Sequence, residues 1–339
     1  MNRIYDLFEP CGIKDKIYDD YLITTCSIKN LEEAELELLC ELLKINNKII
    51  ILSIYYTTFT HHMMNIFTDE LRSMNNIKIL RLFHCDISSN INAFANFLLD
   101  CHLDEMCFSM LSANEEQLKI ICSSLACSGI KTFACVDNSS ESSLLLCKVL
   151  STYSYPHLQS LILSSNHMMP HHIHMLFRNH TIFSILNEFD VYDNDLSQGN
   201  DNNWDNHVKL NIYQNTFSKL EITKLTLSHC NLSNIDIELL FSNISMSLTH
   251  LDISYNCFDN YQPILTDMHD NISNLNSLLI QHNIIVNHIH QQLTDALFNN
   301  TKLIFINVGS DINVEYFMER NMWNTSIKQQ SLLQLLCSS

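Results

Sequence analysis

Leu248-Thr249-His250-Leu251-Asp252-Ile253-Ser254-Tyr255-Asn256 is the stretch that decides the fold. Its apolar residues follow the pattern L-x-x-L-x-L-x-x-N. In a short strand, the last two of those apolar residues point inward and the residue between them points outward. The pattern recurs, with Asn or Cys at its last position, at residues 158–166, 222–230 and 275–283. Recurrence at a fixed period predicts a chain built from stacked repeats.

Weaker copies of the pattern extend the repeat to both ends of the chain. Most copies are 26 to 28 residues apart, and only regular spacing supports the copies that end at Leu111 and Asn138. The interval between Asn194 and Cys230 is 36 residues long, which predicts an insertion near 197–210. The eleven copies end at Cys26, Thr57, Cys85, Leu111, Asn138, Asn166, Asn194, Cys230, Asn256, Asn283 and Asp311.

The segments between these strands have a helical pattern. In 31–43, 92–100, 115–125 and 290–298, apolar residues recur every three or four positions. Glu residues lie early in 31–43, where they suit the positive end of a helix. Each repeat is therefore expected to contain one strand and one helix, with the Asn or Cys turning the chain into the core and satisfying backbone groups there.

Repeats of this length and pattern resemble those of leucine-rich-repeat proteins of the ribonuclease-inhibitor-like subtype. The resemblance covers 18–313. It implies an α/β solenoid, a horseshoe with a parallel β-sheet on its concave face and helices on its convex face, and it implies no reaction. Segments 1–17 and 314–339 are too short for separate domains, and we expect them to cap the solenoid, the second as a helical cap.

Composition excludes several classes of function. The formal net charge of −18 disfavours binding to nucleic acid or to anionic membrane surfaces. Four glycines leave little material for phosphate-binding loops, and no apolar run reaches the roughly 20 residues that span a bilayer. The first ten residues contain acids where a signal peptide needs an apolar core, so we expect a cytoplasmic protein whose 13 cysteines are reduced.

Outward strand positions can be read from the repeat as the residues four, two and one before each Asn or Cys. In the first copy they are Leu22, Thr24 and Thr25. Two clusters emerge from the remaining copies, and exposed aromatic and arginine side chains of this kind are typical of protein-binding hot spots. The first cluster contains Tyr55, Tyr56, Arg81, Phe83 and His84, and the second contains Asp190, Tyr192, Asp193, His229, Asp252, Tyr255 and His282.

Metal binding and nucleophilic catalysis have weaker support. The histidines of 61–62, 171–174 and 288–290 lack the Cys or carboxylate partners of a metal site, so we interpret them as solvated residues on helix faces. His229 and His282 lie on strands too far apart to share a metal ion. Cys107, predicted to point outward one strand from His84, is the one conceivable nucleophile. We expect no metal, no cofactor and no catalytic residue.

These observations favour a monomeric, non-catalytic module that binds a partner protein on its concave face. The Asn- and Ile-rich, Gly-poor composition also resembles that of leucine-rich-repeat effectors of intracellular bacteria, which implies a virulence role in the host cytosol. One alternative is a ligand-binding protein or enzyme that uses the acidic cluster and the loop at 197–210. Another is a substrate adaptor of a ubiquitin ligase, although 1–17 cannot hold an F-box.

Overall fold

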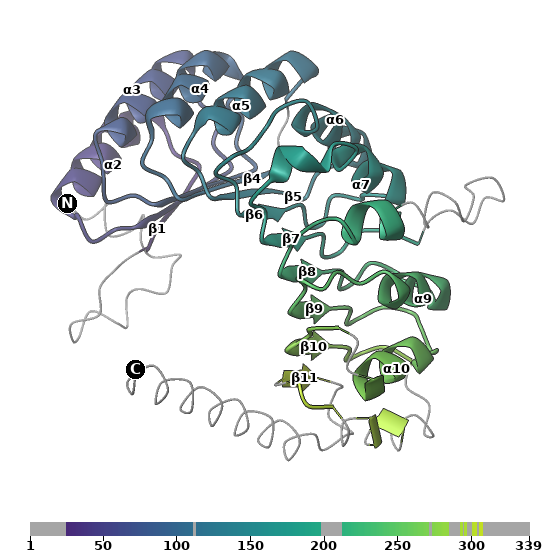
Figure 1. Cartoon of the computed structure of the whole chain (residues 1–339). Helices are drawn as coiled ribbons and strands as arrows, with labels where there is room; N and C mark the ends of the chain where they lie inside the picture. Colours follow the sequence, from purple (N-terminus) through teal and green to yellow (C-terminus); the bar gives the residue numbers. More distant parts are fainter. Residues whose placement is uncertain are drawn as a thin grey trace, which may run out of the picture. The chain divides into compact units, whose positions relative to one another are not determined.

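The computed structural model describes residues 25–110, 113–197, 212–270, 273–284, 292–293, 295–296, 300–303 and 305–307. The fold is α/β, with strands and helices alternating along the chain, and the strand order is the chain order from β1 to β11 (Figure 1). The chain divides into two compact units. The first comprises Met1–His167 and Met175–Leu186, and the second comprises Met168–His174 and Asn187–Ser339.

The first unit pairs its strands in parallel, each with the next strand along the chain. Helices lie along one side of these strands, and among the described residues the other side carries no helix (Figure 1). We call the side without helices the open face. The strands are β1 (Thr25–Lys29), β2 (Ile51–Tyr55), β3 (Ile79–Phe83), β4 (Glu105–Ser109), β5 (Thr132–Val136) and β6 (Ser160–Ile162). The helical segments are α2 (Glu33–Ile45), α3 (His61–Arg72), η3 (Ser88–Asn90), α4 (Ile91–Asp100), α5 (Glu115–Cys127), α6 (Ser140–Leu150) and η4 (His180–Phe183).

The second unit repeats the arrangement with three-residue strands, and each strand from β7 to β10 pairs in parallel with the next. Its strands are β7 (Glu188–Asp190), β8 (Lys224–Thr226), β9 (His250–Asp252), β10 (Ser277–Leu279) and β11 (Phe305–Asn307). Its helices are η5 (Ile212–Phe217), α9 (Asn234–Ser242) and α10 (Gln262–Asp270), and α7 (Pro170–Leu176) has its first five residues in this unit.

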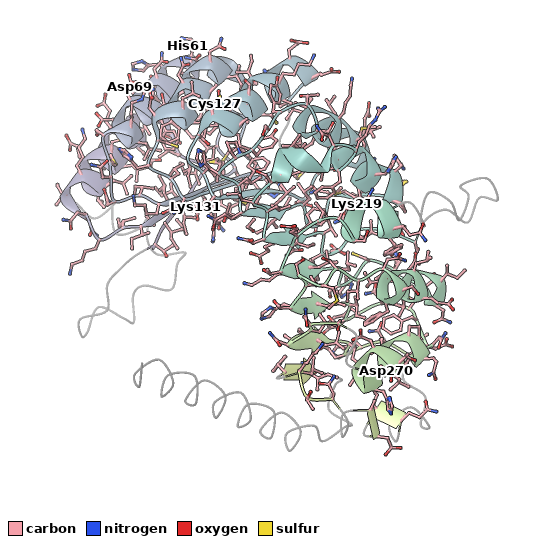
Figure 2. The ribbon with its side chains drawn as sticks, viewed as in Figure 1. His61, Asp69, Cys127, Lys131, Lys219 and Asp270 are labelled. Atoms are coloured by element: carbon pink, nitrogen blue, oxygen red, sulfur yellow. The ribbon has the colours of Figure 1, made fainter. Side chains whose placement is uncertain are left out.

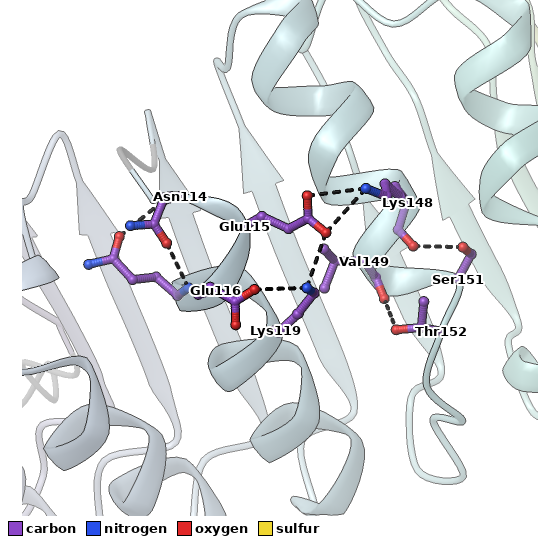
Figure 3. Close-up of polar contacts among 9 residues, drawn as sticks. Asn114, Glu115, Glu116, Lys119, Lys148, Val149, Ser151 and Thr152 are labelled. Atoms are coloured by element: carbon purple, nitrogen blue, oxygen red, sulfur yellow. Dashed lines mark hydrogen bonds and ion pairs between the residues drawn. The ribbon is translucent and has the colours of Figure 1, made fainter.

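Local sequence explains where the helices begin. Glu32 and Glu35 form a capping box before α2, and Asn114 and Gln117 form another before α5, so backbone N–H groups at both helix starts are satisfied. Figure 3 shows two ion pairs of Glu115: Lys148 Nζ of α6 lies 3.1 Å from its Oε2 and links the two helices, and Lys119 Nζ, within α5, lies 3.1 Å from its Oε1. Exposed pairs of this kind contribute about 0–1 kcal/mol each. Burial of the opposite helix face is therefore the main source of stability.

The core is built by the inward residues that the repeat predicts. Leu161, Leu163, Leu251 and Ile253 are each at most 1% exposed. The pairing of β3, β4 and β5 places Leu82 opposite Phe108 and Phe108 opposite Cys135, which confirms the register of the two weakest copies. The strand and helix pattern of the repeat is thus confirmed in the described residues, apart from the first copy.

The first copy is misplaced by the sequence pattern. β1 pairs with β2 so that Cys26 lies opposite Leu52, which makes Cys26 an inward strand residue and not a turn residue. Leu31 takes the turn position instead, where its N–H donates to Thr57 Oγ1 at 3.0 Å. Cysteine is small and apolar, so it fits either position. The outward residues of β1 are therefore Ser27, Lys29 and Asn30, in place of Leu22, Thr24 and Thr25.

The asparagines at the turn positions link neighbouring repeats, as the sequence predicts. Asn256 Oδ1 accepts the N–H groups of Cys230 and Leu232, both at 2.9 Å. Asn138 donates its backbone N–H to Asn166 Oδ1 at 2.9 Å. Cys230 uses its thiol in the same place, donating to Val191 O at 3.1 Å. Each side chain satisfies backbone groups that stacking would otherwise leave buried without a partner.

Three predicted segments lie outside the described residues. These are the N-terminal cap at 1–17, the helical C-terminal cap at 314–339, and the insertion at 197–210 except for Ser197. The predicted helix at 290–298 is described only at 292–293 and 295–296. In the part of the chain that the structure describes, no helix is both long and apolar enough to cross a lipid bilayer.

Candidate functional site

A line of residues in the left-handed backbone conformation runs along the open face of each unit. Each of these residues directly precedes a turn position, and their φ angles lie between 50° and 59°. Eight of these ten N–H groups donate to a carbonyl of the following repeat, as Tyr56 N does to Phe83 O at 2.9 Å and His229 N to Ser254 O at 3.1 Å. They are Asn30, Tyr56, His84, Met110, Asp137 and Ser165 in the first unit, and Asp193, His229, Tyr255 and His282 in the second.

This backbone conformation favours Gly, Asn and Asp, and costs other residues about 1–2 kcal/mol. Five of the ten positions nevertheless carry a Tyr or His. The uniform hydrogen bonding places their rings at the same height on successive strands, so neighbouring rings stack. The sequence places these residues on the open face, but their left-handed geometry appears only in the structure.

In the first unit, four predicted residues form one patch. Tyr55 stacks on Phe83 with ring centroids 4.9 Å apart, and Tyr56 stacks on His84 at 4.8 Å. The two stacks meet where Tyr55 and Tyr56 lie 6.5 Å apart. Tyr56 is 55% exposed. We call these four residues the first-unit aromatic patch. Met110, which lies outside the predicted cluster, is 49% exposed in the same left-handed line.

Arg81, the fifth predicted member of this cluster, is engaged within the sheet. Its Nε and Nη2 donate to Glu105 Oε1 at 3.0 Å and 2.9 Å. Glu105 is the first residue of β4 and lies opposite Ile79, two positions before Cys107, which lies opposite Arg81. The repeat therefore places Arg81 and Glu105 on the same face of neighbouring strands. His84 Nε2 lies 3.8 Å from Asp137 Oδ2, close enough for an ion pair when the imidazole is protonated. Arg81 and His84 therefore each have an acidic neighbour.

Cys107 does not have the environment of a nucleophile. It is 6% exposed, and desolvation raises the pKa of its thiol to about 12, with the nearby Arg81 opposing the shift. Other small outward residues are buried too: Ser53, Ala134, Ser228 and Ser254 are each at most 5% exposed. The prediction that outward side chains are solvent-exposed is therefore wrong at these small residues. A side chain can point away from the helices and still be buried.

In the second unit, the predicted rings form a longer stack. His229 stacks on Tyr255 at 4.7 Å, and Tyr255 stacks on His282 at 4.2 Å. Tyr192 meets His229 at 5.5 Å with its ring tilted by 67°. We call these four residues the second-unit ring ladder. All four are exposed, Tyr192 by 40% and Tyr255 by 42%.

The acids of the second cluster lie beside this ladder. Asp190 Oδ1 accepts the N–H of Tyr192 at 2.8 Å. Asp252 Oδ1 accepts the N–H of Ser254 at 2.9 Å and its hydroxyl at 2.6 Å. Asp193 is exposed in the left-handed line next to His229. The carboxylates of Asp190 and Asp252 therefore share hydrogen bonds with the chain segments that carry them, which fixes their positions relative to the rings.

Histidines on the helices differ from the prediction at one position. His61 and His62 are exposed on α3, and Figure 2 shows His61 and Asp69 on the side of that helix away from the strands. His172, in contrast, is 1% exposed, and its Nδ1 accepts the N–H of Met169 at 2.8 Å. Desolvation, and then the neighbouring His171, lowers the pKa of His172 to about 4. This side chain is therefore buried within the fold and is not solvated.

Among the described residues, no group of three or more His, Cys, Asp or Glu side chains is arranged to hold a metal ion. His288 and His290 lie outside these residues, as do Leu111, Gly309, Ser310 and Asp311 of the predicted repeats. All eleven described cysteines are free thiols, and only Cys127 and Cys257 among them are exposed. Comparison with models of protein families finds no match, and neither does comparison with curated protein sequences.

Proposed function

We propose that the chain is a leucine-rich-repeat protein of the ribonuclease-inhibitor-like subtype that binds another protein through its open face and catalyses no reaction. The L-x-x-L-x-L-x-x-N/C pattern, a strand and a helix in each repeat, and side chains at the turn positions that bond the next repeat all support the family assignment. By its composition, we propose further that it acts as an effector in a host cytosol.

The first-unit aromatic patch is the observation that carries the binding proposal. Two stacked pairs on adjacent strands present aromatic surface to solvent, and two of those rings occupy a backbone conformation that disfavours them. Stacking also limits the movement of the rings, which lowers the entropic cost of ordering them against a partner. Buried aromatic side chains are the residues that most often contribute 2 kcal/mol or more to a protein interface, on the order of a 30-fold change in Kd.

The test is a variant that removes this patch and leaves the fold intact. Tyr55→Thr, Tyr56→Asn and Phe83→Thr combine two residues that suit strands with one that suits the left-handed position. The matched control replaces exposed apolar residues on helix α2, Leu38→Gln and Ile45→Gln, which are 38% and 84% exposed. Partners captured from lysate are identified by mass spectrometry, and each purified partner is then titrated against all three proteins.

We expect a purified partner to bind the natural protein and the α2 variant with the same Kd, and to bind the patch variant at least about 30-fold more weakly. Circular dichroism and the midpoint of thermal unfolding provide the folding control. A partner that binds the patch variant as tightly as the natural protein would refute the assignment of this surface.

A further inference from the structure

The observed register of β1 places a lysine next to the first-unit aromatic patch. Lys29 is the last residue of β1 and lies opposite Tyr55 in the parallel pairing of β1 with β2. The N–H of Asn30 donates to Tyr55 O at 2.9 Å, so this end of β1 is fixed against the strand that carries the patch. Lys29 is exposed on the open face. Because paired strands lie only about 5 Å apart, a partner that covers the Tyr55 ring also meets Lys29.

Lys29 has no anionic partner in the part of the chain that the structure describes. Its ammonium group takes part there in no ion pair and no hydrogen bond. Elsewhere in the first unit, four lysines each lie beside a carboxylate, namely Lys44, Lys119, Lys131 and Lys148. Carboxylates outnumber cationic side chains in this chain, which has a formal net charge of −18, yet none of the described ones pairs with Lys29.

The other charges near the patch already have partners. Among the described outward residues of β1 to β6, Arg81 is the only further Lys or Arg, and it bonds Glu105. His84 lies beside Asp137, which follows β5. Since β1 and β5 are four strand spacings apart, about 19 Å, Asp137 is well beyond the screening length of about 8 Å at physiological ionic strength. Asp137 therefore does not compensate Lys29.

These features indicate the chemistry of a partner. The stacked rings of the first-unit aromatic patch favour an aromatic side chain on the partner, because ring contacts add to the gain from burial. A partner placed there also removes water from around Lys29, and a charged group that loses water without an opposite charge is destabilised. A carboxylate on the partner offsets this loss, and it also discriminates against basic segments.

Strand spacing sets the distance between the two partner groups. Lys29 is one strand spacing from Tyr55 and two from Phe83, which is about 5 to 10 Å. In an extended segment that crosses the strands, residues two positions apart point the same way and lie about 7 Å from each other. An acid and an aromatic residue separated by one residue therefore match this surface.

We propose that the first unit binds an extended segment of a partner protein in which an acidic residue lies two positions from an aromatic residue. The carboxylate pairs with Lys29, and the aromatic ring packs on the first-unit aromatic patch. This inference deepens the proposed function and rests on it, because it names the partner chemistry for the same surface.

The experiment selects binders from a phage-displayed library of random peptides, with the full chain as bait. The natural protein, Lys29→Glu and the control Lys48→Glu are used in parallel at an ionic strength of about 0.15 M, which screens attraction between distant charges. Lys48 is exposed, and its side chain is also unpaired within the described residues. It lies before the start of β2, at the opposite end of that strand from Tyr55. Both substitutions change the net charge equally.

We expect the natural protein and Lys48→Glu to select peptides with Asp or Glu two positions from an aromatic residue. Lys29→Glu should select Lys or Arg at that place, because the charge beside the patch is reversed. The most enriched acidic peptide is then synthesised with a fluorescent label and titrated by fluorescence anisotropy. Its binding should be about two- to fivefold weaker to Lys29→Gln than to the natural protein, as for an exposed ion pair, and unchanged in Lys48→Gln.

Three results would overturn the inference. The first is the absence of enriched peptides, or enrichment without an acid near the aromatic residue. The second is selection of the same acidic peptides by Lys29→Glu. The third is concentration-dependent dimerisation of the natural chain that Lys29→Glu abolishes in analytical ultracentrifugation, which would assign the surface to a second copy.

The first-unit patch variant distinguishes failure of the inference from failure of the proposed function. Tyr55→Thr/Tyr56→Asn/Phe83→Thr should lose the selected peptides, because their aromatic residue packs on the rings that it removes. Peptides that need the patch but carry no acid would refute the inference and leave the proposed function supported. Peptides and protein partners that bind this variant as tightly as the natural protein would refute both.

Discussion

Replacing Asn256 with alanine removes a side chain that holds two repeats together. Asn256 is 5% exposed and makes five hydrogen bonds with its amide. Its Oδ1 accepts the N–H groups of Cys230 and Leu232, and its Nδ2 donates to Leu227 O, all at 2.9 Å in the preceding repeat. The other two bonds, to Ile253 O and Ser254 O, lie within its own repeat.

The loss of stability depends on which backbone groups lose their hydrogen-bond partner. Ile253 O still accepts from Asn283 Nδ2, and Ser254 O still accepts from His229 N. The N–H groups of Cys230 and Leu232 and the carbonyl of Leu227 lose the bonds that Asn256 provides. A buried polar group without a partner costs about 1–3 kcal/mol. The free energy of unfolding should therefore fall by about 3–5 kcal/mol, after allowance for water that enters the space left by the amide.

Urea denaturation followed by circular dichroism, with amide hydrogen exchange at Cys230 and Leu232, measures this effect. Asn256→Cys should cost less than alanine, because the chain itself uses a cysteine thiol at the equivalent position of Cys230. Asn274→Ala is the control, since its amide donates to Met246 O at an exposed site. A loss below about 1 kcal/mol for Asn256→Ala, equal to that of the control, would refute the view that these amides hold the stack together.

Three further predictions concern protonation, thiol access and backbone conformation. The unfolded chain should protonate His172 near the ordinary histidine pKa of 6.5, whereas burial lowers the pKa of His172 in the folded protein to about 4. The neutral imidazole therefore contributes its full share of the folding stability above pH 6.5, and this share is lost as the pH falls towards 4. It amounts to about 3 kcal/mol at most. Denaturation across this range should show a smaller acid loss in His172→Asn, which keeps an acceptor for Met169, and equal losses would contradict the assignment. Of the described cysteines, Cys127 and Cys257 should react with maleimide fastest, because they are exposed, and peptide mass mapping can measure this. Labelling of the buried thiols at the same rate would argue against their burial in the core. Tyr56→Asn should change the free energy of unfolding by less than about 1 kcal/mol, because relief of backbone strain at φ 53° offsets the lost ring contact with His84. A loss above about 2 kcal/mol in thermal unfolding would show that the ring contact outweighs the strain.

Prediction from sequence succeeds where a residue type can occupy only one kind of position in the repeat. A leucine in the middle of a repeat strand has to point into the core, so Leu161 and Leu251 are placed correctly by spacing alone. The copies that end at Leu111 and Asn138 are also placed correctly, because regular spacing between stronger copies leaves one register. Cys26 is placed wrongly because cysteine suits both an inward strand position and a turn, and only the pairing with Leu52 distinguishes them.

For the candidate surfaces too, spacing predicts some features and leaves others undetermined. Counting back from each turn residue is enough to bring Tyr55, Tyr56, Phe83 and His84 together on one face. Exposure is not predicted by that count, because a small outward side chain such as that of Cys107 is buried in the folded chain. The engagement of Arg81 with Glu105 also depends on side-chain conformation, which the spacing of the repeat does not specify.

By itself, the sequence determined the periodic α/β fold, the inward residues and the face on which the polar and aromatic residues lie, because each depends on local spacing repeated many times. The tertiary structure alone decided how these side chains meet: the left-handed line that stacks the rings, the burial of the small outward residues and the hydrogen bonds that fix the carboxylates. The physical reason is that direction follows from the backbone of one repeat, whereas exposure and contact depend on side chains of neighbouring repeats.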